Sequence, residues 1–77
     1  MKMCQRLRDL REDKDLTQTQ IGEILGIDQR VYSIYEMGKR QIPVHYLMKL
    51  ALLYNTSMDY LVGLTDNPAP YERKRSR

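Results

Sequence analysis

Apolar residues recur at helical spacing along most of this chain of 77 residues. Where apolar side chains return every three or four positions, an amphipathic helix is expected. Short polar or glycine-containing breaks divide the pattern into five such runs, which predict an all-α fold of five short helices. Residues 3–12 form the first run, residues 44–54 the fourth and residues 58–62 the fifth. The fourth run is broad, because Met48 and Leu52 widen its apolar stripe, and we expect it to make contacts on more than one side.

The second and third runs lie in a central stretch, residues 16–36, around which the rest of the chain is organised. Thr17 is a good N-cap, and Gln20 three residues later completes the pattern of a capping box. Gly26 can end the first of these two helices in the left-handed conformation, and Asp28 is the N-cap expected for the next. Two helices joined by three or four residues that include a glycine are typical of a helix-turn-helix.

The second helix of this motif has two different faces. At about 100° per residue, Val31, Tyr32 and Tyr35 fall on the face that we expect to be buried. The opposite face carries polar side chains at the helix start, where a recognition helix meets base edges. We predict four base contacts on that face: Gln29, Arg30, Ser33 and Ile34. Glutamine suits adenine, arginine suits guanine, serine can meet a base or a phosphate, and isoleucine can pack on a thymine methyl. The alternative is an ordinary surface face, since glutamine and arginine are common on protein surfaces.

The joint pattern L-T-Q-x-x-I-G-x-x-L-G-I-D-x-x-x-Y-S-x-Y-E-x-G-K-R-x-x-P resembles the Xre and phage Cro/repressor family of DNA-binding domains. The resemblance covers residues 4–64. It implies a compact, five-helix, lambda-repressor-like domain whose recognition helix enters the major groove. Gly22 fits this interpretation, because a glycine inside a helix costs about 1 kcal/mol relative to alanine and is expected where backbones approach closely. At Ile34 the chain departs from relatives that have a polar side chain, so we expect either contact with a methyl group or no readout of that base step.

The resemblance also implies contacts to the DNA backbone. In the family, the residue that matches Gln18 reaches a phosphate and braces the first recognition residue, here Gln29. Arg11 and Glu36 match a family pair that forms a partly buried salt bridge, and the loop after the recognition helix follows the backbone. We therefore predict five phosphate contacts: Thr17, Gln18, Arg11, Lys39 and Arg40. Such contacts add affinity and salt dependence but no sequence information. The alternative for the two loop residues is a solvated loop.

The fifth run holds many apolar residues for so short an element. Leu61 is expected to close the core, and the remainder would be exposed in a monomer. In the family, this end of the domain often forms the contact of a two-fold dimer. We predict a homodimer with five interface residues: Met58, Tyr60, Leu61, Val62 and Leu64. The alternative is that all five pack internally.

Charge and composition refine the domain boundaries. The formal net charge is +3, but residues 71–77 carry four basic side chains and one acidic one, which accounts for all of it. The placement of charge, rather than its total, must therefore support nucleic-acid binding. We expect one small helix-turn-helix domain over residues 1–64, followed by an extended or disordered basic tail over residues 65–77. This tail is expected to be solvated, and the alternative is an arm that grips phosphates.

Chemistry other than DNA binding finds little support in the sequence. The single Cys4 cannot form an internal disulfide, which fits a reducing cytoplasm, and with one histidine the chain has too few soft ligands for a zinc site. No paired-carboxylate or phosphate-cradling glycine pattern is present, so we expect no enzyme activity, no catalytic residue, no metal and no cofactor. No apolar run approaches the roughly 18–20 residues that span a bilayer, and no signal peptide is visible. We expect a cytoplasmic protein of a bacterial or phage type, with no membrane partner.

The sequence as a whole predicts a sequence-specific DNA-binding transcriptional regulator, and repression is the action we expect of it. It would bind double-stranded DNA as a homodimer at a two-fold operator, through the major groove. One alternative is an antitoxin-type regulator with the same fold and a protein partner. Another is a protein-interaction module that has lost DNA binding, which the polar chemistry of the recognition face argues against.

Overall fold

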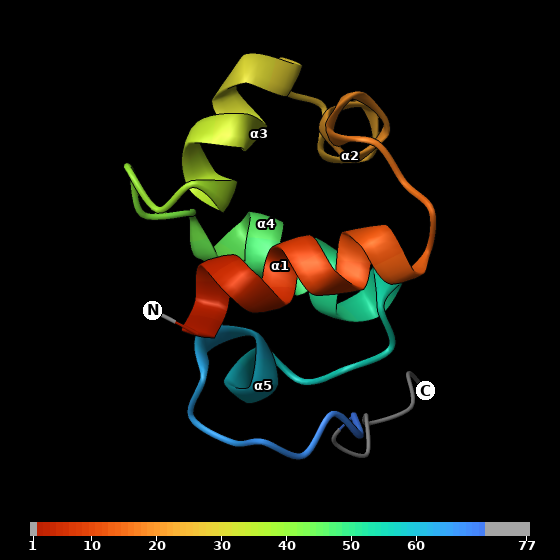
Figure 1. Ribbon diagram of the computed structural model, residues 1–77, viewed down its shortest axis with the longest axis vertical. Helices are drawn as coiled ribbons and strands as arrows, with labels where there is room; N and C mark the ends of the chain where they lie inside the picture. The colour runs from red at the N-terminus through yellow and green to blue at the C-terminus, as the bar shows by residue number, and fades with distance from the viewer. Residues whose placement is uncertain (1, 71–77) are drawn as a thin grey trace, which may run out of the picture.

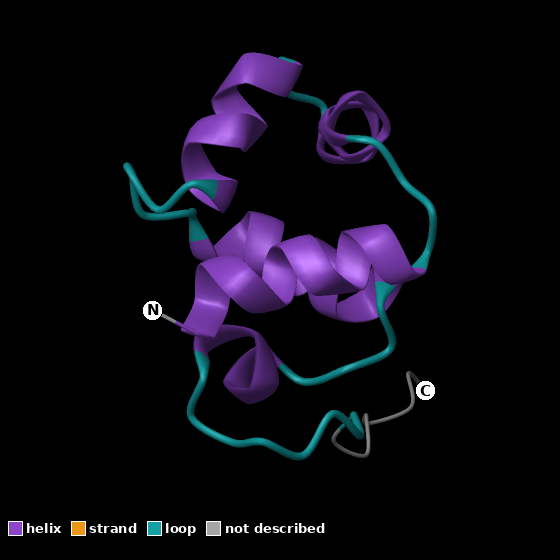
Figure 2. Ribbon diagram, viewed as in Figure 1, coloured by secondary structure: helices purple, strands orange, loops and turns teal. Residues whose placement is uncertain are grey.

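Five α-helices make up the fold, and the part of the chain that the computed structural model describes, residues 2–70, contains no strand (Figures 1 and 2). The helices are α1 (Lys2–Asp13), α2 (Gln18–Leu25), α3 (Gln29–Glu36), α4 (Val44–Leu53) and α5 (Met58–Val62). The prediction of an all-α, five-helix fold is confirmed. In Figure 1, α1 crosses the middle of the view, with α2 and α3 on one side of it and α5 on the other.

The caps that the sequence indicated set the helix boundaries around the central motif. The Thr17 hydroxyl accepts a hydrogen bond from the backbone N–H of Gln20 at 3.1 Å, and the Gln20 side-chain oxygen accepts from the Thr17 N–H at 2.8 Å. This reciprocal capping box starts α2. Gly26 ends α2 in the left-handed region at φ 75°, and Asp28 caps α3 by accepting from the Arg30 N–H at 2.8 Å. The two helices of the motif therefore begin and end where local chemistry predicts.

One cluster of buried side chains draws on every helix and on the loop before α4. Burial of apolar surface is the main force that holds helices of this size together, because few of them would be stable alone. The buried apolar residues are Met3, Leu7, Ile21, Leu25, Tyr32, Tyr35, Ile42, Leu47, Leu50, Ala51, Tyr54 and Leu61. Leu61 is fully buried, so its expected role in closing the core is confirmed.

The exposed side of α4 corrects one expectation. Met48 and Leu52 do not extend the buried stripe, because their side chains are 53% and 62% exposed. Together with the exposed Val44 they follow one another at four-residue intervals along the outside of the helix. Only the opposite side of α4 packs into the core, so α4 contributes an apolar stripe to the surface of the domain.

Arg6 on α1 holds the segment that follows α5, a role that helical spacing alone did not reveal. Its guanidinium donates from Nη1 to the carbonyl oxygens of Tyr60 and Thr65, both at 2.6 Å, and pairs with Asp66. The same group lies 4.1 Å from the centre of the Tyr60 ring. Farther along, the Thr56 hydroxyl donates to the Pro68 carbonyl at 2.6 Å. The first part of the expected tail, residues 65–70, is thus bound to α1 and to the residue just before α5. The basic part of the tail, residues 71–77, lies outside the described residues.

We expect Arg6→Ala to lower the free energy of unfolding by about 1–3 kcal/mol, because two partly buried carbonyls lose a charged donor. Arg8→Ala is the matched control, since Arg8 sits on the same helix and its side chain forms an exposed pair with Glu12. That change should cost about 0–1 kcal/mol. Urea unfolding of the two variants measures the difference, and equal losses would contradict the anchoring role of Arg6.

None of the helices in residues 2–70 is long and apolar enough to cross a membrane. Within the same range, no group of three His, Cys, Asp or Glu side chains is placed to hold a metal ion.

Candidate nucleic-acid interface

The helix-turn-helix depends on a close approach between α2 and the start of α3. A Cβ atom added to Gly22 would lie 2.8 Å from the carbonyl oxygen of Ile27 and 3.3 Å from the backbone nitrogen of Gln29. Both neighbours are backbone atoms that cannot turn aside. The expectation of a close approach at Gly22 is therefore confirmed, and the absence of a side chain there sets how near α3 comes to α2.

A buried ion pair ties α1 to the end of α3. Arg11 donates from Nε and Nη2 to the two carboxylate oxygens of Glu36, each at 2.9 Å. A third donor, Nη1, bonds the carbonyl oxygen of Leu16 at 2.9 Å, just before α2 begins. The two side chains are only 14% and 5% exposed. The pair implied by the family resemblance is thus present, and it joins three segments of the domain.

The charged state of this pair follows from its surroundings. Burial is the largest single influence on Glu36 and opposes its ionisation, but the hydrogen bonds from Arg11, Tyr32 and Gln18 and the positive charge of Arg11 together outweigh it, so the pKa of Glu36 lies below its ordinary value. The hydrogen bond to Glu36 also raises the pKa of Arg11. Both groups therefore remain ionised at neutral pH, and the carboxylate acts only as an acceptor.

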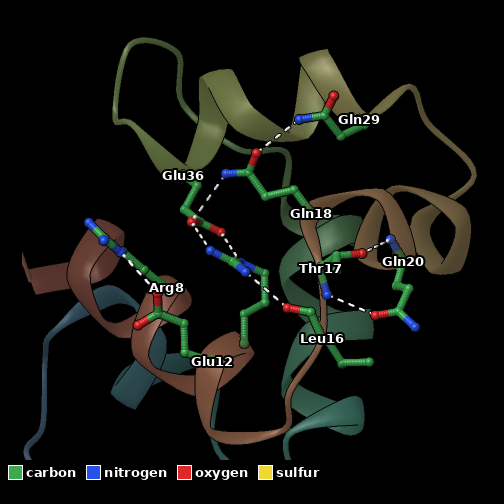
Figure 3. Close-up of polar contacts among 9 residues, drawn as sticks. Arg8, Glu12, Leu16, Thr17, Gln18, Gln20, Gln29 and Glu36 are labelled. Carbon is green, nitrogen blue, oxygen red and sulfur yellow. Dashed lines mark hydrogen bonds and ion pairs between the residues drawn. The ribbon is translucent and has the colours of Figure 1, made fainter.

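Two glutamines continue from this pair to the start of α3 (Figure 3). Gln18 donates from Nε2 to Oε1 of Glu36 at 3.3 Å, and its own Oε1 accepts from Nε2 of Gln29 at 2.9 Å. The expected contact between Gln18 and Gln29 is confirmed. The hydrogen-bonded chain leads from a buried charge to the first residue of the candidate recognition helix.

The two faces of α3 are arranged as the spacing predicts. Tyr32 and Tyr35 are buried, and Val31 is half-buried against the core. On the opposite side, the four predicted base contacts keep solvent access: Gln29, Ser33 and Ile34 are half-exposed and Arg30 is exposed. The Arg30 side chain is 86% exposed and bends back to Asp28 at 3.3 Å, a weak surface pair. It can therefore leave Asp28 for a ligand at little cost.

The predicted phosphate contacts differ in how available they are. Thr17 is exposed at the start of α2, and Lys39 and Arg40 are exposed in the loop after α3, which projects from the helices in Figure 1. Gln18 is half-exposed. Arg11 is the least available of the five, because three of its five N–H donors already serve Glu36 and Leu16.

One further basic residue, Arg8, lies beside this surface and was not among the contacts predicted from the sequence. Arg8 is exposed on α1 and lines a hollow of about 330 Å³ together with Ser33 and Met37 of the α3 end. The helical spacing could have indicated this, because Arg8 lies three residues before Arg11. The two side chains therefore share one side of α1. Its candidate role is contact with a phosphate beside the recognition helix.

At the opposite end, the structure changes the predicted dimer contact. Leu61 is fully buried, so its inclusion in an interface is wrong: it packs in the core instead. Tyr60 is half-buried, with the Arg6 guanidinium over its ring. Met58 and Val62 line an apolar hollow of about 310 Å³ whose lining also includes the exposed Val44 of α4. Leu64 is 77% exposed just beyond α5.

Comparisons with known proteins agree with this geometry. A family model described as helix-turn-helix matches residues 7–61. The uncharacterized HTH-type transcriptional regulator YobD of Bacillus subtilis is 47% identical over 72 residues, which cover 92% of this chain and 64% of that protein. The HTH-type transcriptional regulator ImmR of the same organism is 38% identical over 63 residues, covering 82% of this chain and 50% of the relative. The cryptic phage CTXphi transcriptional repressor RstR of Vibrio cholerae is 32% identical over 58 residues, covering 75% and 52%.

The chain thus spans half to two thirds of the length of these curated relatives. No solved structure gives a significant match to it.

Proposed function

The chain belongs to the Xre-type helix-turn-helix family, and on that premise we propose that it is a sequence-specific DNA-binding transcriptional regulator that acts as a repressor. It would bind double-stranded DNA in the cytoplasm of a bacterial or phage-infected cell. The mechanism is occlusion of a promoter, with no covalent chemistry by the protein. The regulator names of three relatives support this proposal.

The observation that carries the proposal is the exposed face of α3 and its support. Gln29 and Arg30 stand at the start of a helix whose opposite side is buried in the core. A recognition helix needs this arrangement, because its base-reading side chains must be held firmly while they remain open to the groove. Lys39 and Arg40 flank the same helix and would meet phosphates.

Lys39→Ala tests the phosphate role. We expect it to weaken binding to all duplex sequences alike and to reduce the slope of log affinity against log salt by about one unit. Lys49→Ala on α4 removes the same charge from another exposed position and should leave the slope unchanged. Fluorescence anisotropy across a salt series measures both, and a loss confined to some sequences would contradict the placement of this loop along the DNA backbone.

We further propose that the regulator binds a two-fold operator as a homodimer through the apolar hollow between α4 and α5. Met58 and Val62 line the hollow, Val44 forms part of its rim, and Leu64 is exposed nearby. Exposed apolar patches of this kind are typical of contacts between copies. In a dimer of this type, the two recognition helices would reach successive major grooves about 34 Å apart.

Val44→Lys should shift the protein from dimer towards monomer in sedimentation equilibrium without loss of helix content, because Val44 is exposed in the single chain. Leu52→Lys is the control, since Leu52 is equally exposed on α4 but does not line the hollow. A wild-type protein that stays monomeric, or dissociation by Leu52→Lys alone, would contradict this interface.

One observation favours a second candidate partner. Val44, Met48 and Leu52 form an apolar stripe along the exposed side of α4, which begins at the hollow with Val44 and continues away from it. A regulator of the antitoxin type would use such a stripe to hold a second protein. DNA binding remains the primary proposal, because the α3 face has the polar chemistry that base recognition requires.

A further inference from the structure

Two tyrosine hydroxyls lie inside the domain rather than at its surface. Tyr32 stands in the middle of α3 and is fully buried, and Tyr54 ends α4 and is 7% exposed. Within residues 2–70, neither hydroxyl oxygen meets a partner at the distance and angle of an ordinary hydrogen bond. Buried polar groups in folded proteins are nearly always hydrogen-bonded, to protein or to water, so these two hydroxyls call for a partner.

The Tyr32 hydroxyl lies beside the carboxylate of Glu36. Tyr32 precedes Glu36 by four residues, so the two side chains share one side of α3. The O–H group is directed at the carboxylate, in a contact that is longer or more bent than an ordinary hydrogen bond. Burial above all, and then this contact, raise the pKa of Tyr32. The proton of Tyr32 is therefore kept, and the lone pairs of its oxygen face away from Glu36.

Tyr54 reaches the same polar region from α4. Burial, and after it the negative charge of Glu36, raise the pKa of Tyr54 to about 12, while the charge of Arg11 acts in the opposite direction. Tyr32 and Tyr54 also influence each other electrostatically. The Tyr54 hydroxyl thus lies near enough to these groups to interact with them, yet it forms a direct hydrogen bond with none of them. Polar contacts of this kind are commonly bridged by water.

The donors and acceptors that face this place define what fits there. The Tyr54 O–H needs an acceptor, and the Tyr32 oxygen can accept because its own proton is turned to the carboxylate. A bridging group must therefore accept from one hydroxyl and donate to the other. An anion would face the charge of Glu36, and a cation would face that of Arg11. A small neutral molecule that both donates and accepts remains, and water is the smallest of these.

We propose that one water molecule is bound inside the domain, where it accepts from the Tyr54 hydroxyl and donates to the Tyr32 oxygen. Its second hydrogen is directed at the carboxylate of Glu36. It then makes three hydrogen bonds, the usual number for an internal water. Such a molecule ties the end of α4 to the middle of α3 and is a fixed part of the fold, independent of any DNA contact.

Oxygen-17 magnetic relaxation dispersion tests the site on the full chain, because it detects long-lived internal waters and does not respond to hydroxyl protons. The double variant Tyr32→Phe/Tyr54→Phe removes both hydroxyls and keeps the rings that fill the core. Tyr46→Phe is the matched control, since Tyr46 is a half-buried tyrosine of α4 whose hydroxyl is not one of the two buried ones. We expect the dispersion amplitude to fall by one water molecule in the double variant and to be kept in the control.

Urea unfolding of Tyr54→Phe gives a second readout. If the hydroxyl is bonded to water, its loss should raise the equilibrium constant of unfolding about fivefold. If the hydroxyl has no partner, the change should leave that constant unchanged or lower it, because phenylalanine removes a buried polar atom at no cost. Tyr46→Phe should leave the constant close to that of the wild type.

Equal dispersion amplitudes in the wild type and the double variant would overturn the internal water, and so would a Tyr54→Phe protein as stable as the wild type. A crystal structure with the two hydroxyl oxygens in direct contact would do the same, since the stability loss would then report a tyrosine pair. Circular dichroism establishes that each variant is folded. Should the double variant unfold, Tyr54→Phe carries the dispersion test, because it removes the donor that the water accepts from.

Discussion

Replacing Gly22 with valine is expected to destabilise the domain by about 1–3 kcal/mol or more, through overpacking against atoms that cannot move aside. The Cβ would meet the Ile27 carbonyl oxygen at 2.8 Å, and two further methyl groups would need space in the same gap. Relief requires α3 to move away from α2. The variant should therefore also lose DNA affinity at temperatures where it remains folded.

Thermal unfolding and duplex binding of Gly22→Val measure the two effects. Thr19→Val is the control, since it places the same β-branched side chain at an exposed position of α2. It should change the midpoint of unfolding little. An unfolding midpoint for Gly22→Val equal to that of the wild type would show that the α2–α3 distance is not set at this position.

Arg30→Ala is expected to relax the preference at one operator position at a cost of about 1–3 kcal/mol, because a bidentate arginine contact to guanine is lost. Within residues 2–70, the guanidinium of the free protein pairs with the exposed Asp28 at 3.3 Å, a weak surface contact that it can leave for guanine. Anisotropy titrations with operators altered one base pair at a time measure the preference. Lys49→Ala serves as the control for lost charge, and an unchanged preference in Arg30→Ala would remove Arg30 from the set of base contacts.

Local chemistry made most of the candidate site predictable. The caps at Thr17 and Asp28, the left-handed Gly26 and the two faces of α3 each depend on residues within one or two helical turns. Such features can be recognised in the sequence because the partners are neighbours. The Arg11–Glu36 pair joins residues 25 positions apart, and only the family resemblance indicated it.

Features that depend on distant partners were not predictable in the same way. Arg6 bonds carbonyl oxygens 54 and 59 residues away, and a basic residue on a helix gives no sign of such an anchor. Met48 and Leu52 continue an apolar pattern, yet no element of the described chain covers them. The orientation of the Gln29 amide was not predictable from the sequence either, because it follows from which atom of Gln18 faces a buried carboxylate.

The central claim is that the chain reads DNA sequence as a dimer through the start of α3. Selection of bound duplexes from a random pool tests it most directly, with the double variant Gln29→Ala/Arg30→Ala beside the wild type. The account predicts that the wild type enriches an inverted repeat whose half-sites lie about 10 base pairs apart or a multiple of that, and that the double variant does not. No enrichment at low salt, or the same repeat recovered by the double variant, would contradict it.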